Sequence, residues 1–213
     1  MPEAAFSREQ ICAHRGASGN YPENTCAAFD AAASVGVGWI ETDIQCLADG
    51  ELAIFHDTHL GRTAPGSAKV SSLTWPAMAE LDIGSWRGAA FAYERPLRCE
   101  DLIAWQAEAS ERPGIVWEVK CDDQPAAVDA AVAAVTDRLR DVSDHRCIVS
   151  SFSRDVLSAL RPQLPAIPMA LIAEELPDDG VVFCQEHGLE GIHLDGHQVT
   201  QEGARAVLDA GLA

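Results

Sequence analysis

The sequence predicts an α/β fold built from parallel strands. Two observations support this prediction: short apolar runs alternate along the chain with helical patterns, and several of the runs carry ionisable residues at their ends. Parallel strands need long crossover connections, usually helices, so this alternation is typical of βα units. With 213 residues, 47% of them hydrophobic, the chain can bury one large core, and we expect a single domain over residues 1–213.

The expected elements follow from these patterns in chain order. The short apolar runs expected to form strands are Ile11–His14, Trp39–Gln45, Leu52–His56, Ile115–Lys120, Cys147–Ser151, Met169–Ile172 and Gly191–Leu194. The alanine-rich or amphipathic segments expected to form helices are Asn24–Val35, Asp101–Ser110, Ala126–Arg140, Arg154–Leu160 and Glu202–Ala210. Thr25 is of a type favoured at helix N-caps, which supports the first of these helices.

The alternation is interrupted once, after the third expected strand. The interval from His56 to Glu100 is rich in Gly and Pro and has no pattern for a long helix. Long irregular segments in compact domains are often functional covers. We therefore expect an inserted segment at about residues 57–100 that lies over one end of the sheet, with a brief helix after Thr74.

Composition excludes several classes of function. The 15 basic and 33 acidic residues give a net charge of −18, which repels nucleic acid and anionic membranes. A phosphate-bearing ligand would therefore need a metal or a well-placed Lys or Arg. The seven cysteines are scattered, the N-terminal residues have no secretory pattern, and no apolar run is long enough to span a membrane. We expect a reduced, cytoplasmic chain without stable membrane association, and a homo-oligomer is compatible with these features.

Ionisable residues gather at the ends of the first four expected strands. They are His14 and Arg15, Glu41 and Asp43, His56 and Asp57, and Glu118 and Lys120. Residues two apart on a strand share a face, so each of the pairs Glu41/Asp43 and Glu118/Lys120 points one way while its apolar neighbours point the other. One such pair could be the solvated edge of an open sheet. Four consecutive strands with this pattern favour a shared site.

This set of residues has the chemistry of a metal-assisted phosphoryl transfer site. Glu41, Asp43 and Glu118 offer carboxylate oxygens to a hard divalent cation, Mg²⁺ or Ca²⁺. Lys120 and Arg15 could bind an anionic oxygen, with a planar, bidentate geometry in the case of Arg15. His14 and His56 are suited to act as a general base and a general acid on either side of a bound group.

The ordered motifs resemble those of the glycerophosphodiester phosphodiesterases, in the superfamily of PLC-like phosphodiesterases. The matching segments are His14-Arg15-Gly16, Pro22-Glu23-Asn24-Thr25, Glu41-Thr42-Asp43, Asp49-Gly50, His56-Asp57 and Glu118-Val119-Lys120. The segment from His56 to Trp86 resembles the insertion that these enzymes carry after their third strand, and Cys147–Arg161 resembles their fifth strand and helix. The resemblance runs from about Ile11 to the end of the chain.

This resemblance implies a TIM (β/α)₈-type barrel with its site at the C-terminal ends of the strands. It implies metal-dependent hydrolysis of a glycerophosphodiester to sn-glycerol 3-phosphate and an alcohol. His14 and His56 would be the acid–base pair, and Arg15 and Lys120 would contact phosphate. The metal ligands would be Glu41, Asp43 and Glu118.

The sequence departs from the family pattern at its end and leaves two alternatives open. Only seven strands are expected, so we expect the given sequence to lack the eighth strand and helix of the barrel. One alternative is a lipid phosphodiesterase of the lysophospholipase D or sphingomyelinase D type. The other is a barrel that binds a phosphate ligand without turning it over.

Overall fold

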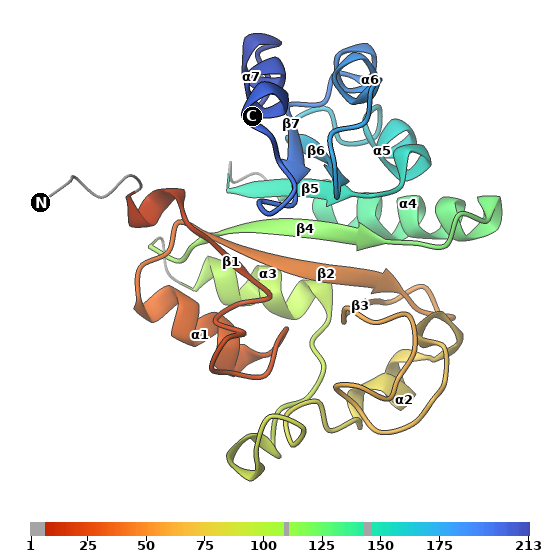
Figure 1. Cartoon of the computed structure of the whole chain (residues 1–213). Coiled ribbons are helices and arrows are strands. Elements are labelled where there is room, and N and C mark those ends of the chain that lie inside the picture. The colour runs from red at the N-terminus through yellow and green to blue at the C-terminus, as the bar shows by residue number, and fades with distance from the viewer. Residues whose placement is uncertain (1–6, 109–110, 143–145) are drawn as a thin grey trace, which may run out of the picture. The chain divides into compact units, whose positions relative to one another are not determined.

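The computed structural model of the chain describes residues 7–108, 111–142 and 146–213 (Figure 1). It divides into two compact parts, Met1–Glu118 and Val119–Ala213. The last two residues of the helix expected over Asp101–Ser110 lie outside the described residues. None of the helices in the described ranges is both long and apolar enough to cross a membrane.

The strands of the first part bring the N-terminal motifs side by side. After a single turn of 3-10 helix over Arg8–Gln10, β1 (Cys12–His14) pairs in parallel with β2 (Trp39–Cys46), and this register sets His14 opposite Glu41. On its other side β2 neighbours β4 (Gly114–Lys120), which begins with a 2.8 Å hydrogen bond from Gly114 N–H to the Gly38 carbonyl. The order β1–β2–β4 therefore places the ends of three strands at one edge of the sheet.

The third strand differs from the expected parallel arrangement. β3 (Leu52–Ile54) pairs with β2 in antiparallel fashion, with Ile54 opposite Ile44. β2 and β3 are joined by a tight turn, in which the Leu47 N–H donates to the Glu51 carbonyl at 2.8 Å. This turn is too short for the crossover connection that a parallel pair of strands needs. Gly50 has φ +82° in this hairpin loop, a conformation that glycine adopts at little cost.

Two helices cover the strands of the first part. In α1 (Cys26–Ser34) the Thr25 side chain caps the helix, and Ala28, Phe29 and Ala32 are buried. In α3 (Cys99–Ala107) the buried residues are Cys99, Leu102 and Trp105. This helix begins two residues earlier than expected, because the Asp101 carboxylate accepts a 2.8 Å hydrogen bond from the Arg98 N–H and so caps the first turn.

The inserted segment contains little regular secondary structure and contributes to a small apolar cluster. It contains a 3-10 turn over Val70–Ser72, the brief helix α2 (Trp75–Ala79) expected after Thr74, and a second 3-10 turn over Ala89–Phe91. Its buried apolar side chains pack against β3 and its flanking residues in one cluster, which consists of Leu47, Ala53, Phe55, Ala64, Val70, Met78 and Ile83. The segment also contacts the loop between β1 and α1, where the Arg87 guanidinium donates to the Gly19 carbonyl and Phe91 meets Tyr21 edge to face.

The second part follows the expected alternation closely. Its three parallel strands lie in the order β5 (Cys147–Ser151), β6 (Met169–Ala173) and β7 (Gly191–Leu194). Its helices are α4 (Pro125–Leu139), α5 (Arg154–Leu160), α6 (Gly180–His187) and α7 (Gln201–Asp209). Helix α6 was not expected, because its apolar residues do not gather on one face. In the described ranges the chain thus has the seven strands that the sequence predicts.

Candidate metal and phosphate site

Three carboxylates from two neighbouring strands converge in the first part of the chain. Glu41 and Asp43 lie on β2 and Glu118 lies on β4, and one oxygen from each lies within 4.8 Å of the others. The alternation along β2 explains this geometry, because Glu41 and Asp43 leave the same face of the strand. Asp43 is fully buried and Glu118 is 7% exposed. These are the three residues expected from the sequence to offer oxygens to a divalent cation.

Arg15 joins the carboxylates from the end of β1. Its backbone N–H donates to the Glu41 carbonyl at 2.9 Å and to Glu41 Oε2 at 3.0 Å. Its side-chain Nε lies 3.3 Å from Asp43 Oδ2, and a terminal nitrogen donates to Glu23 Oε1 at 2.9 Å. Arg15 has φ +57°, a left-handed conformation that is costly outside glycine and occurs often at functional sites.

Asn24 is a site residue that the sequence reasoning assigned only to the loop and helix start. It is 2% exposed and has φ +58°. Its side-chain NH₂ donates to Asp43 Oδ2 at 2.8 Å, and its carbonyl oxygen accepts from the Thr42 hydroxyl at 2.9 Å. Asn24 therefore orients a carboxylate of the cluster, while the helix cap falls to Thr25. A signal for this role was present in the sequence, since Asn tolerates the left-handed region better than other residues with side chains.

The two predicted histidines each lie beside a carboxylate, but not the same one. The His14 Nε2 lies 3.8 Å from Glu41 Oε2. His56 follows β3, and its Nδ1 lies 2.7 Å from Asp57 Oδ1, to which it donates a hydrogen bond. The pKa of His14 is lowered by partial burial, and then by the positive charge of Arg15 and, to a smaller extent, that of His56. The two imidazoles therefore lie close enough for the charge of His56 to affect the pKa of His14.

Lys120 ends β4, two residues beyond Glu118, and is partly buried. Side chains two apart on a strand leave the same face, so its position on β4 agrees with the pattern expected from the sequence. Lys120 belongs to the second part of the chain, and its contact with phosphate remains a prediction.

The carboxylate cluster fits a bound cation. Glu41 Oε1 is buried and has no hydrogen-bond partner among the described residues. Burial, together with the charges of Asp43 and Glu118, raises the pKa of Glu41 to about 8. Ionised carboxylates so close together need compensation, and an all-oxygen donor set is the kind that hard divalent cations select. The cluster can therefore hold a metal ion.

Comparison with known proteins agrees with this geometry. Residues 14–212 match the Glycerophosphoryl diester phosphodiesterase family. The chain belongs to this family. Its sequence is 34% identical over 162 residues to YhdW of Bacillus subtilis strain 168, and the match covers 76% of this chain and 65% of that relative, just under two thirds of its length. A glycerophosphodiester phosphodiesterase of the same organism is 30% identical over 214 residues, which cover 94% of this chain and 73% of that protein.

Solved structures of the family have the same fold. A phosphodiesterase of Oleispira antarctica, in complex with the product sn-glycerol-3-phosphate, matches with a TM-score of 0.88 and 25% identity, covering 95% of this chain and 81% of that one. A glycerophosphodiester phosphodiesterase of Agrobacterium tumefaciens C58 matches with a TM-score of 0.76 and 28% identity, covering 95% and 83%. The predicted fold class, a TIM-type α/β fold without an eighth strand and helix in the described residues, is confirmed.

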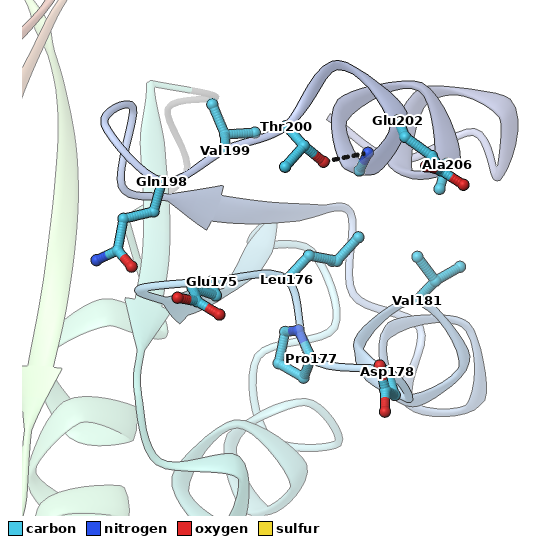
Figure 2. A pocket seen from close by; sticks show the side chains of 11 residues that line it. Glu175, Leu176, Pro177, Asp178, Val181, Gln198, Val199, Thr200, Glu202 and Ala206 are labelled. Atoms are coloured by element: carbon cyan, nitrogen blue, oxygen red, sulfur yellow. Dashed lines mark hydrogen bonds between the residues drawn. The ribbon is translucent and has the colours of Figure 1, made fainter.

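The second part of the chain has a separate pocket of about 640 Å³ (Figure 2). It lies between the segments that lead into α6 and α7, and its walls include Leu176, Pro177 and Val199. Three exposed carboxylates also line it, from Glu175, Asp178 and Glu202. The sequence analysis did not predict this pocket, and it contains none of the predicted site residues.

Proposed function

We propose that the chain hydrolyses glycerophosphodiesters to sn-glycerol 3-phosphate and an alcohol. The observation that carries the proposal is the convergence of the Glu41, Asp43 and Glu118 carboxylates within 4.8 Å of one another, beside Arg15 and His14, in a chain of this family. The product complex of the Oleispira antarctica relative is consistent with this substrate class.

The two histidines are proposed to move the protons of the reaction. One imidazole takes a proton from the attacking water molecule as the new P–O bond forms. The other gives a proton to the alcohol oxygen as its P–O bond breaks, so the sum of the steps adds one water to the diester. The Asp57 carboxylate, 2.7 Å from the His56 Nδ1, fixes the tautomer of that ring and leaves its Nε2 for proton transfer.

The carboxylates and the basic residues are proposed to neutralise the phosphate. Glu41, Asp43 and Glu118 would hold a divalent cation, Mg²⁺ or Ca²⁺, which when bound stabilises negative charge on phosphoryl oxygens. Arg15 would bind a phosphoryl oxygen through its guanidinium, which is already held in place by Glu23 and Asp43. Lys120 would supply a second positive charge from the end of β4.

The proposal is tested by the release of glycerol 3-phosphate from glycerophosphocholine, with Mg²⁺, with Ca²⁺ and with EDTA. We expect turnover that requires the cation, and H14A and H56A are each expected to lower kcat by about 10²-fold or more. His59→Ala is the matched control, since His59 is exposed and lies three residues from His56.

The outcomes of this assay separate the alternatives. Turnover of lysophosphatidylcholine in preference to glycerophosphocholine would favour a lipid phosphodiesterase instead. Absence of turnover with every metal would leave only a phosphate-binding role. Unchanged rates in H14A and H56A would remove both histidines from the acid–base chemistry.

A further inference from the structure

Arg62, in the inserted segment, contacts two carboxylates at once. Its Nε and one terminal nitrogen donate to the two oxygens of Asp57, at 2.7 and 2.8 Å. Its terminal nitrogens donate to the two oxygens of Glu23, both at 2.7 Å. Each carboxylate is thus bound through both of its oxygens, the geometry for which a planar guanidinium is suited and an ammonium is not.

Each of these carboxylates also contacts a residue of the proposed site. Asp57 Oδ1 accepts from His56 Nδ1 at 2.7 Å, and Glu23 Oε1 accepts from Arg15 at 2.9 Å. The contacts form one continuous chain through His56, Asp57, Arg62, Glu23 and Arg15. Arg62 is its central member, and unlike the other four it belongs to none of the short motifs quoted above for the family resemblance.

The backbone around these residues is held by other contacts. The Gln45 side chain donates to the Phe55 carbonyl at 2.7 Å and to the Asp57 carbonyl at 3.0 Å. The Arg15 N–H is held by the carbonyl and the carboxylate of Glu41. Loss of Arg62 would therefore leave the main chain in place and release mainly the side chains of Asp57 and Glu23.

We propose that Arg62 is a positioning residue that orients His56 through Asp57 and Arg15 through Glu23. The inference rests on the proposed function, because it assigns those two side chains to the reaction. Removal of Arg62 frees the rotamers of both carboxylates, so the imidazole and the guanidinium that they hold lose their fixed orientation. Partners of this kind affect activity by about 10- to 100-fold in comparable sites.

The test compares Arg62→Ala and Arg62→Lys with Arg87→Ala. Arg87 is a matched control, because it also joins the inserted segment to the β1–α1 loop, through the Gly19 carbonyl, yet among the described residues it bonds to none of those that link His56 to Arg15. We expect R62A to lower kcat/KM for glycerophosphocholine by about 10- to 100-fold, with the fall mostly in kcat. R62K should recover only part of the loss, and R87A should change kcat by less than about twofold.

A second measurement does not depend on turnover. The ring signals of His56 in NMR spectra, assigned by their loss in H56A, should shift in R62A and not in R87A. Unchanged His56 signals in R62A, an unchanged kcat/KM, or an equal loss in R87A would each overturn the proposal. If the unaltered chain turns over no glycerophosphodiester, the proposed function fails, and the NMR comparison alone decides whether Arg62 positions His56.

Discussion

Three carboxylates converge in the first part of this molecule and three others line the pocket of the second part, but only the first group has the properties of a metal site. Glu41, Asp43 and Glu118 have oxygens within 4.8 Å of one another and are buried or nearly so. The carboxylates around the pocket of the second part, from Glu175, Asp178 and Glu202, are all exposed (Figure 2). Burial removes the water that would otherwise compensate the charges, so those of the first group must be compensated by a bound cation, a proton or a basic side chain, whereas those of the second are compensated by solvent.

The two groups of carboxylates also differ in the contacts made by the residues around them. Asp43 is held by Asn24 at 2.8 Å and by Arg15 at 3.3 Å, and both of these residues adopt left-handed backbone conformations. None of the described residues that line the pocket has a left-handed backbone conformation, and the hydrogen bond from Gly203 N–H to the Thr200 hydroxyl, at 3.0 Å, is an ordinary helix cap. Strained residues held by several contacts are therefore a better indication of a functional site than the number of acidic residues.

The largest expected effect separates these two groups of acids. D43N should lower the rate of glycerol 3-phosphate release by about 10³-fold, because metal-derived charge stabilisation of several kcal/mol would be lost and roughly 1.4 kcal/mol corresponds to a factor of ten. Steady-state kinetics at saturating Mg²⁺ measure the loss, and calorimetry measures the accompanying loss of metal affinity.

The matched control for this prediction is Asp178→Asn, the same chemical change at an exposed acid of the pocket. It should leave kcat within about twofold of the unaltered chain, as expected of surface substitutions. A D43N variant that kept more than a tenth of the activity would show that the buried cluster is not the catalytic centre.

The sequence was sufficient to predict this cluster because strand alternation is strictly periodic. Glu41 and Asp43 had to share a face once Trp39–Gln45 was identified as a strand, and the parallel neighbours β1 and β4 brought their own ends to the same edge. The seven strands and four of the helices were located within two residues at each end, whereas α3 begins two residues earlier than expected and the expected end of that helix lies outside the described residues. The helix α6 was missed because its apolar residues do not follow one face.

Contacts between distant loops could not be predicted in this way. The antiparallel pairing of β3 depends on the hairpin at Gly50, which the alternation of strands and helices did not reveal. The role of Asn24 depends on its left-handed backbone, and that of Arg62 depends on the path of the inserted segment toward Glu23, 39 residues earlier in the chain. No periodic pattern encodes either of these contacts.

An effect of intermediate size is expected when the pH is changed, on the stability of the metal-free protein. The pKa of Glu41 is raised to about 8 in the folded state, above its unfolded value of 4.5, by burial and by the charges of Asp43 and Glu118. The folded state therefore binds more protons than the unfolded state between these values, so stability increases as the pH falls from about 8 toward 5. In EDTA the Tm should rise by several °C from pH 8 to pH 6, since about 1 kcal/mol corresponds to 2–4 °C for a chain of this size.

Two comparisons test whether Glu41 is the cause of this pH dependence. E41Q should flatten the dependence of the Tm on pH, whereas Glu175→Gln should leave its slope unchanged. Mg²⁺ should raise the Tm more at pH 8 than at pH 6, because the cation competes with the proton on Glu41. A metal-free Tm that falls from pH 8 to pH 6, with E41Q following the same curve, would contradict the assignment.

The smallest effect is expected at the pocket of the second part. Glu202 lies in the first turn of α7, where a negative charge favours the helix dipole by about 0.3–1 kcal/mol, so E202Q should lower the free energy of unfolding by that amount or less. Glu175 is not in a helix, and in a chain with net charge −18 its neutralisation should relieve repulsion, so E175Q should be neutral or slightly stabilising. Urea denaturation of both variants measures these opposite signs. A loss above about 1 kcal/mol in E175Q, or a fall in glycerol 3-phosphate release in either variant, would mean that the exposed acids are more than a solvated surface.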